Sequence, residues 1–484
     1  MLRPLKLTLT DKIDPARKTP IYIQIIQAVV RDIERGRLPK GTYLPSSREL
    51  AYALGVNRKT VVLAYEDLIA QGWLSAQGTR GTFVSNDLPD PSHRRAPPED
   101  APARADYRFT PPPARPLALP AGTIKLDEGA PDGRLFPAEP LARAHRAAIQ
   151  RAARGNGFQY RDPRGHPALR EAVAAMLRSE RGLSVSAANI CITRGSQNGI
   201  FLAAQVLMQP GHAALFEELT YEPAVAAFRA CGAQIVTAGL DENGIRVEDV
   251  EQACRRHAVR AIFLTPHHQF PTTVALRAER RLQLLNLAGQ FGFAIVEDDY
   301  DHEFHFESQP LMPMAAYAPS HVIYVGSLSK LMLPSLRIGY IAAPEKVINA
   351  IAHFVSVTDG MGNTITEDAA AELITSGEIK RHARKVRQTY LQRRDAYAEA
   401  LRATLGERVE FALPDGGLAF WLRFRDPADL ARIEAQGGAH GLSFASADSF
   451  ALTPEAPRGL RLGFASLNDA ERATALRTLK RILG

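Results

Sequence analysis

Apolar residues near the start of the chain recur at the spacing of short amphipathic helices. The first such stretch begins at Pro20 and stops near Gly36, and its apolar positions are Ile21, Ile25, Val29 and Ile33. A second helix is predicted to open at Ser46 or Ser47, either of which is a suitable N-cap, and to end at Gly55.

A third helix is predicted from Arg58 to about Ala70, followed by two apolar runs. These runs extend from Trp73 to Val84 and flank the sequence Gln77-Gly78-Thr79-Arg80-Gly81, which is typical of a β-hairpin. Two short helices joined by a tight turn and followed by a hairpin predict a winged helix-turn-helix over residues 1–85.

The pattern changes over residues 86–120, which are dense in proline and have no apolar periodicity. This composition predicts an extended, semi-rigid linker.

Residues 121–484 alternate between apolar β-rich runs and helical stretches. The runs are Ile190–Thr193, Ala214–Phe216, Ala261–Leu264, Ala294–Val296 and Val322–Val325, and the helical stretches include Pro167–Glu180, Arg277–Gln290 and Ile379–Leu401. This order predicts an α/β domain with a mostly parallel sheet, and a carboxyl-terminal α+β subdomain from about residue 345.

The composition is that of a globular protein without a membrane segment. The chain has 484 residues, of which 45% are hydrophobic and 23% charged. It contains no apolar run of membrane-spanning length and no signal-peptide core at its amino terminus. The three cysteines lie far apart and suit neither a metal nor a disulfide framework. A reducing cytoplasm is therefore the expected location.

The positive charge is concentrated in the first module. Residues 1–84 hold 13 Lys and Arg against 7 Asp and Glu, whereas the whole chain has a net charge of +7. Such a bias indicates nucleic-acid binding, although a merely soluble basic domain would have it too. The residues expected to reach base edges or phosphates of operator DNA are Arg48, Asn57, Arg58, Lys59, Thr60 and, at the wing tip, Arg80. The alternative is a structural helical hairpin whose arginines are solvated.

Side chains suited to an aldehyde cofactor cluster at predicted strand ends. Lys330 follows an apolar strand and could form an imine, and Asp298 could pair with a pyridine nitrogen. Tyr300 could donate to the ring oxygen. A phosphate could be held by Arg337 and by hydroxyl and amide groups at Ser196, Gln197, Ser327 and Ser329.

Taken singly, these residues have ordinary explanations. Lys330 could be a surface lysine, Asp298 and Asp299 a metal site or a solvated loop, and Ser196 an N-cap. Their joint order and spacing favour a site for an aldehyde cofactor with a pyridine ring and a phosphate, which is pyridoxal phosphate.

Residues 18–85 resemble the GntR-type winged helix. The matching motifs are Gly41-Thr-Tyr-Leu-Pro-Ser-Ser-Arg-Glu-Leu-Ala, Leu54-Gly-Val-Asn-Arg-Lys-Thr-Val and Gly81-Thr-Phe-Val. Residues 125–484 resemble fold-type I aminotransferases, and specifically the chimeric MocR subfamily of GntR regulators. The motifs are Tyr160-Arg-Asp-Pro-Arg-Gly165 with Leu169-Arg170, Thr193-Arg-Gly-Ser-Gln197, Thr265-Pro-His-His-Gln-Phe-Pro271, Glu297-Asp-Asp-Tyr-Asp301, Gly326-Ser-Leu-Ser-Lys330 and Leu460-Arg-Leu-Gly-Phe464.

The resemblance implies a role for each matching residue. Lys330 would bind pyridoxal 5'-phosphate as a Schiff base, Asp298 would pair with its ring nitrogen, and Tyr300 with its phenolic oxygen. Ser196, Gln197, Ser327, Ser329 and Arg337 would surround the phosphate, and Tyr221 would stack near the ring. The resemblance also implies that Tyr160 reaches the phosphate of a partner subunit in a homodimer. Arg461 would bind the acid group of an amine effector.

One departure from the aminotransferase pattern concerns Phe270. Aminotransferases usually carry an asparagine there, bonded to the cofactor oxygen, and its loss should weaken turnover unless His268 or Gln269 compensates. The expected function is therefore that of a cytoplasmic transcription factor that senses an amine, an amino acid or the cofactor itself. A true aminotransferase with an accessory DNA module is the alternative, and a cofactor-free structural domain is a third.

Overall fold

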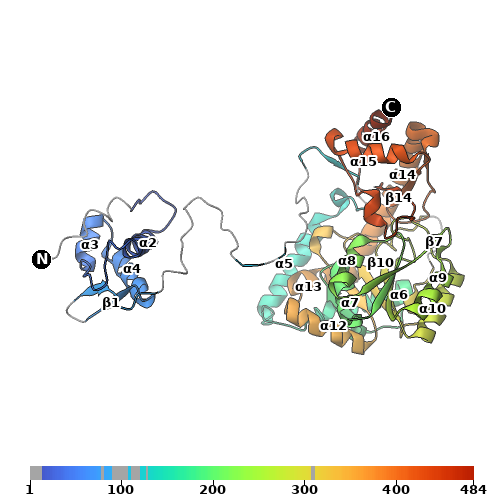
Figure 1. Cartoon of the computed structure of the whole chain (residues 1–484). Helices are drawn as coiled ribbons and strands as arrows, with labels where there is room; N and C mark the ends of the chain where they lie inside the picture. Colours follow the sequence, from blue (N-terminus) through green and yellow to red (C-terminus); the bar gives the residue numbers. More distant parts are fainter. Residues whose placement is uncertain are drawn as a thin grey trace. The chain divides into compact units, whose positions relative to one another are not determined.

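The computed structural model describes residues 13–77, 81–89, 107–108, 110, 120–126, 129–306 and 311–484. Arg80 and most of the predicted linker lie outside these ranges. The chain divides into two units, Met1–Arg115 and Pro116–Gly484, each of which is described by itself (Figure 1). Within the described ranges, no helix combines the length and the apolar character needed to cross a membrane.

The amino-terminal unit is a winged helix-turn-helix, as predicted. Its elements are α2 (Ile21–Glu34), α3 (Ser47–Leu54), α4 (Arg58–Ala70) and an antiparallel hairpin of β1 (Leu74–Ala76) and β2 (Thr82–Val84). Ser46 caps α3 in a reciprocal capping box with Glu49. Gly55 ends α3 with a φ of 65°, a left-handed conformation that favours glycine.

The large unit is built on a seven-stranded sheet with the order β4-β12-β11-β10-β9-β5-β6. The strands are β4 (Ile190–Thr193), β5 (Ala213–Glu217), β6 (Gln234–Ala238), β9 (Val259–Leu264), β10 (Ala294–Asp299), β11 (Val322–Ser327) and β12 (Gly339–Ala342). Only β12 runs antiparallel to its neighbours β4 and β11. The predicted mostly parallel sheet is thus confirmed.

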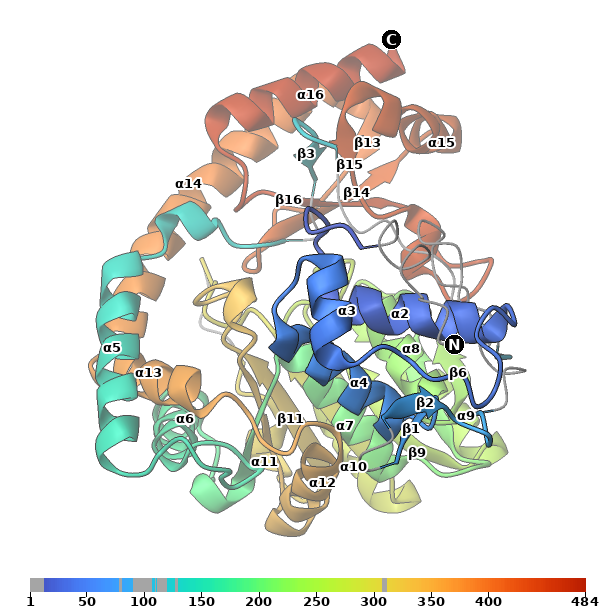
Figure 2. The same ribbon diagram turned by 90° about the vertical axis from the view of Figure 1, so that its left-hand side faces the viewer.

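Helices cover both faces of this sheet (Figure 2), and strands such as β4 and β5 are therefore buried on both sides. Alternate strand residues such as Phe216, Phe263 and Val296 pack with one group of helices: α7 (Ser196–Leu207), α8 (Glu222–Ala230) and α12 (Glu345–Thr358). The intervening residues, such as Leu215 and Ile295, pack with the other group: α5 (Ala138–Arg154), α6 (Pro167–Arg181), α9 (Val247–Arg256), α10 (Ala278–Phe291), α11 (Met314–Tyr317) and α13 (Thr364–Thr375).

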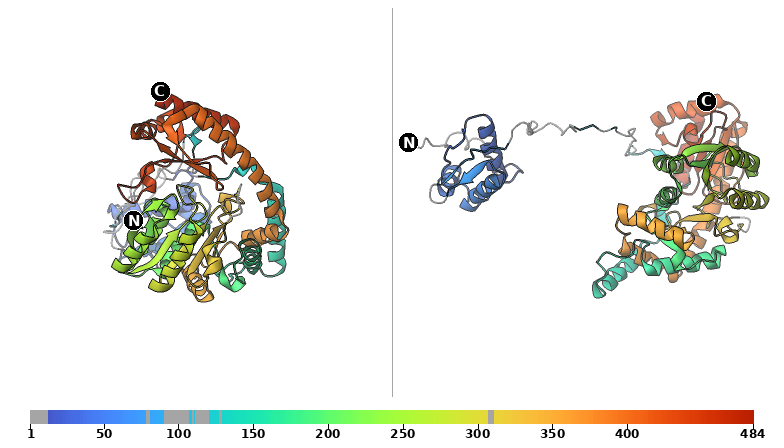
Figure 3. Two further views of the ribbon diagram at one scale, coloured as in Figure 1. Left: turned by 90° about the vertical axis from the view of Figure 1, so that its right-hand side faces the viewer. Right: turned by 60° about the horizontal axis from the view of Figure 1, so that its bottom comes forward.

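A second layer with its own core forms the carboxyl-terminal part of this unit (Figure 3). It comprises α14 (Glu378–Leu405), β13 (Val409–Glu410), β14 (Ala419–Phe424), α15 (Pro427–Gln436), β16 (Leu460–Gly463) and α16 (Asp469–Leu483). The short strand β15 (Leu442–Ser443) pairs with β3 (Ile124–Lys125). Because α12 and α13 pack on the sheet, the carboxyl-terminal core begins near Val386 and not at about residue 345.

Candidate cofactor and DNA sites

A cavity of about 490 Å³ lies where β10 and β11 end and α7 begins. Its lining includes most of the residues predicted for a cofactor, namely Ser196, Gln197, Tyr221, Asp298, Tyr300, Ser327, Ser329, Lys330 and Arg337. These side chains come from separate stretches of the chain and are brought together because strand ends of a mostly parallel sheet share one edge.

The start of α7 forms a cationic and amide-rich corner of this cavity. Gly195 precedes the helix with a φ of 82°, and a Cβ there would lie 3.0 Å from the Arg337 guanidinium. The same guanidinium donates to the carbonyl oxygen of Arg194 at 2.9 Å. A helix amino terminus beside a guanidinium is suited to an anion such as phosphate.

Two hydroxyls complete this corner. The Ser327 hydroxyl accepts a hydrogen bond from the Ser329 amide at 3.1 Å. The buried Ser329 hydroxyl has no hydrogen-bond partner among the described residues, so it remains able to bind an oxyanion.

Asp298 places a carboxyl group in the cavity under strong desolvation. Burial and the negative charge of Asp299 raise its pKa to about 8, against the opposing influence of Lys330. Its Oδ1 atom is buried and accepts no hydrogen bond from any described residue. A buried acceptor of this kind suits a protonated ring nitrogen, which would supply both a hydrogen bond and a positive charge.

Lys330 and Tyr300 lie together at the cavity. The Lys330 ammonium is 4.3 Å from the centre of the Tyr300 ring. The Tyr300 hydroxyl donates to the His268 carbonyl oxygen at 2.9 Å and accepts from Arg461 at 3.3 Å. Burial raises the pKa of Tyr300 above its ordinary value. Tyr300 therefore keeps its hydroxyl hydrogen, and this hydrogen is already donated to the His268 carbonyl oxygen.

Arg461 does not line the cavity, although it was predicted to bind an effector. It is 1% exposed and donates to the carbonyl oxygen of Pro271 at 2.6 Å. Its guanidinium also lies 4.5 Å from the centre of the Phe270 ring. The predicted effector contact thus lies directly behind Phe270 and Tyr300, two residues that do line the cavity.

Neither His268 nor Gln269, the polar residues expected to compensate for the missing asparagine, lines the cavity. The Gln269 amide donates to the Glu217 carboxyl group at 3.0 Å and to the Leu219 carbonyl oxygen at 2.7 Å. The His268 ring bonds to Asp301 at 2.7 Å. Phe270 itself contributes to the lining, so an apolar ring occupies this position.

The two tyrosines predicted to flank the cofactor differ in position. Tyr221 lines the cavity and meets Phe270 edge to face, with ring centres 5.2 Å apart. Tyr160 is 88% exposed and lies outside the cavity of its own chain.

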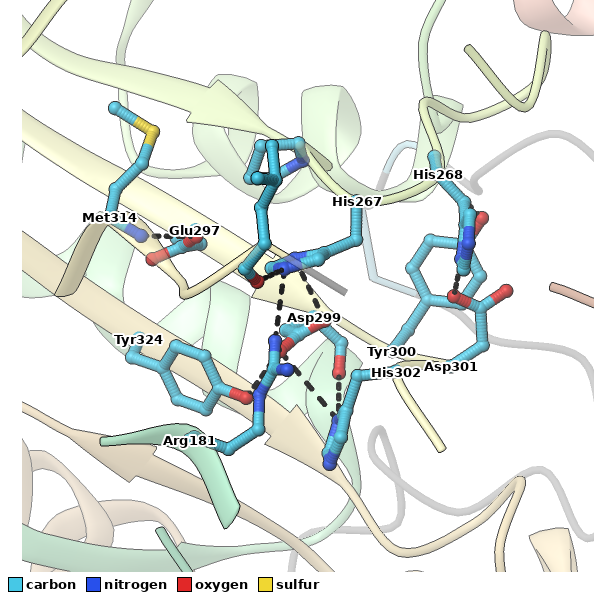
Figure 4. Close-up of polar contacts among 12 residues, drawn as sticks. Arg181, His267, His268, Glu297, Asp299, Tyr300, Asp301, His302, Met314 and Tyr324 are labelled. Carbon is cyan, nitrogen blue, oxygen red and sulfur yellow. Dashed lines mark hydrogen bonds and ion pairs between the residues drawn. The ribbon is translucent and has the colours of Figure 1, made fainter. Parts of the chain in front are cut away.

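Sequence reasoning missed a buried polar network on the other face of β10 (Figure 4). Asp299 accepts hydrogen bonds from Arg181 and Tyr324, both at 2.5 Å, and pairs with His267 at 3.2 Å. Burial alone would raise the pKa of Asp299, but His267, Arg181 and His302 hold it well below its ordinary value. The signal that could have revealed this network is the acidic run Glu297-Asp298-Asp299, which ends a strand that starts with apolar residues and is almost entirely buried.

Ser449 and Phe450 also line the cavity and were not predicted. They lie in the carboxyl-terminal layer, more than a hundred residues from Lys330 along the chain. Only the tertiary fold brings them to the site.

On the amino-terminal unit, the predicted DNA contacts gather where α3 and α4 begin. Arg48, Arg58 and Lys59 are exposed, and the Arg58 Nε donates to the Ser47 hydroxyl at 3.4 Å. The Asn57 side-chain oxygen caps α4 by accepting from the Lys59 amide at 2.9 Å, so its amide nitrogen is the group left for a base. Thr60 is half-buried.

Comparison with known proteins matches both units. The family model for aminotransferase class I and II covers residues 121–479, and that for the bacterial regulatory proteins of the gntR family covers residues 21–84. The probable rhizopine catabolism regulatory protein MocR of Rhizobium meliloti is 29% identical over 97% of this chain and 94% of its own length. The HTH-type transcriptional regulator TauR of Rhodobacter capsulatus is 30% identical over 87% of this chain and 89% of its own.

The large unit also matches solved enzymes. An archaeal alanine:glyoxylate aminotransferase superposes with a TM-score of 0.70 and 25% identity, covering 75% of this chain and 90% of the enzyme. Together, the winged helix and the large unit define a DNA-binding transcriptional regulator with an aminotransferase-like domain. The chain belongs to the aminotransferase class I and II family, and its amino-terminal module matches the gntR family. The combination of the two is that of the MocR subfamily of GntR regulators, to which the chain belongs.

Proposed function

We propose that this regulator binds pyridoxal 5'-phosphate at Lys330 and that its affinity for operator DNA changes when an amine or amino-acid effector binds. The observation that carries this proposal is the orphaned, buried oxygen of Asp298 in the cavity that Lys330 also lines. The anion-binding corner formed by α7 and Arg337 supports it, because the cofactor carries both a ring nitrogen and a phosphate.

Each group of the cavity has a distinct task in this proposal. The bound cofactor would supply an aldehyde that reacts reversibly with amines, so that effector and Lys330 compete for it. Asp298 would keep a proton on the ring nitrogen. Ser329, the α7 amides and Arg337 would hold the phosphate, while Tyr221 and Phe270 would exclude water around the ring.

Effector recognition would involve Arg461. Its guanidinium is already bonded to the Tyr300 hydroxyl. A carboxylate reaching Arg461 would therefore compete with Tyr300, which links effector binding to the tyrosine beside Lys330.

The functional unit in this proposal is a homodimer. Tyr160 is almost fully exposed on its own chain, as a residue that completes a partner's phosphate site would be. A change in the ligand domain would alter the spacing of the two winged helices, and operator affinity would follow from the difference in ligand affinity between the two arrangements.

Covalent trapping tests the cofactor assignment. Purified full-length protein is mixed with pyridoxal 5'-phosphate, reduced with borohydride and digested, and the modified peptide is located by mass spectrometry. We expect the label on Lys330, and its loss in Lys330→Ala but not in a variant at the exposed Lys346. Labelling spread evenly over surface lysines would contradict the proposal.

A further inference from the structure

A second cavity, of about 550 Å³, lies on the face of the sheet opposite the predicted cofactor site. It opens between α6 and α14 and is closed below by residues that follow β10 and β11. None of its lining residues belongs to the first cavity. No role in cofactor or DNA binding accounts for it.

The floor of this cavity holds polar groups with unmet hydrogen-bonding capacity. The Glu303 side chain is 9% exposed, and neither of its oxygens accepts a hydrogen bond from another described residue. Its nearest ionic neighbour is His302, whose Nε2 lies 3.3 Å from Oε1. A buried carboxyl group in this state is costly and favours a ligand that brings hydrogen-bond donors, such as an ammonium group.

The rim carries the opposite charge. Lys380, Arg384 and Arg387 are exposed on α14 and line the opening. Lys380 is paired with Glu180 at 3.0 Å, whereas Arg384 and Arg387 form no ion pair with any described residue. Two guanidinium groups at a cavity mouth favour a carboxylate.

The walls between floor and rim are apolar, and include Met176, Leu331 and Ile379. We propose that this cavity is a second ligand site, which binds an amino carboxylate with its ammonium group at Glu303, its hydrocarbon stem along these walls and its carboxylate at Arg384 and Arg387. No bond is made or broken in this binding, and it does not require Lys330 or pyridoxal phosphate.

The site is placed to influence the first cavity. Asp298 faces one cavity, while its neighbour Asp299 binds Arg181, which lines the other. Likewise, Lys330 lines the first cavity and Leu331 the second. A ligand that shifts the floor of the second cavity therefore acts on the two segments that carry the predicted cofactor contacts.

Calorimetric titration tests this site. The probes are unbranched amino carboxylates from glycine to 6-aminohexanoate, with hexanoate and hexylamine as partners lacking one charged end. Full-length protein is first reduced with borohydride in the presence of pyridoxal 5'-phosphate, so that amine exchange at Lys330 cannot contribute. We expect at least one amino carboxylate to bind at least about tenfold more tightly than either single-ended partner.

Matched variants locate the binding. Glu303→Gln and Arg384→Gln should each weaken it about tenfold, whereas Lys385→Gln, on the exposed surface of the same helix outside the cavity, should leave it unchanged. Binding by no probe, equal binding of single-ended partners, or undiminished binding in Glu303→Gln would overturn the inference. Failure of cofactor binding alone would appear only in the labelling experiment, so the two proposals stand or fall separately.

Discussion

Asp298 and Asp299 are neighbours on β10, yet their carboxyl groups lie on opposite faces of the sheet and their pKa values are shifted in opposite directions. Burial beside Asp299 raises the pKa of Asp298 to about 8, whereas His267, Arg181 and His302 hold the pKa of Asp299 well below its ordinary value despite its burial. The difference arises from the partners. Asp299 has a guanidinium and two imidazoles around it, whereas the charged neighbours that influence Asp298 are one cation, Lys330, and two carboxylates, Asp299 and Asp301.

Replacing Asp298 with asparagine should stabilise the cofactor-free protein at alkaline pH. The pKa of Asp298 is about 8 in the folded protein and 3.8 in its ordinary state. The stabilising contribution of this carboxyl group to the free energy of unfolding is therefore fully present only below pH 3.8. That contribution is lost progressively as the pH rises to about 8. Relative to the parent, the free energy of unfolding of Asp298→Asn should therefore rise over this window and then level off, by about 1–3 kcal/mol in all.

Urea unfolding across this pH range measures the effect. Glu455→Gln, which removes an exposed carboxylate from the same unit, should show no such rise. The same Asp298→Asn change should weaken pyridoxal phosphate binding at least about tenfold, because the ring nitrogen would lose its anionic partner. If the difference in unfolding free energy between Asp298→Asn and the parent did not change with pH, and the affinity for the cofactor were intact, the proposed role would be contradicted.

Lys330→Ala should separate DNA binding from its control. The winged helix folds around its own core, so affinity for operator DNA without cofactor should stay within about twofold of the parent. The visible absorbance of the lysine-bound cofactor, and any change in DNA affinity that depends on an amine, should disappear. Fluorescence anisotropy with labelled DNA checks this, with Lys346→Ala as the control. Survival of the amine response would rule out exchange at Lys330.

Arg181→Met should destabilise the large unit strongly. The substitution leaves the buried Asp299 carboxylate without its guanidinium partner, a change that typically costs about 3–5 kcal/mol. Arg178→Met, on the exposed side of the same helix, should cost less than about 1 kcal/mol. Chemical denaturation followed by fluorescence compares the two. Similar midpoints would show that the Asp299 network adds little to stability.

Sequence patterns anticipated those parts of the site that are local in the chain. Ser327, Ser329 and Lys330 were predictable because the first of them ends an apolar strand and the other two follow it. Ser196 was predictable because it opens a helix after another strand. Phe450 was not predictable, because only packing of the carboxyl-terminal layer brings it to the cavity.

The wrong boundary of the carboxyl-terminal subdomain and the missed Asp299 network have the same origin. The helices α12 and α13 follow the last strand of the sheet in the chain, yet they pack back onto that sheet. Likewise, Arg181 reaches Asp299 across 118 positions of sequence. Local periodicity contains no information about contacts at such separations.

Arg58→Ala should reduce specific operator affinity more than its charge alone would. Arg58 is exposed at the start of α4, the helix expected to enter the major groove, and loss of a base contact costs about 1–3 kcal/mol. Arg35→Ala removes the same charge from an exposed position at the end of α2. Affinities for operator and unrelated DNA distinguish the variants. Equal losses in both would mean that Arg58 contributes only general electrostatics.

The most direct measurement is binding of the full-length protein to the DNA upstream of its own gene, with and without pyridoxal 5'-phosphate, over a series of salt concentrations. A cofactor-responsive regulator should bind this DNA at least about a thousandfold more tightly than unrelated DNA, and its affinity should change when the cofactor is added. Weak binding that is equal on both DNAs, falls steeply with salt and ignores the cofactor would contradict it.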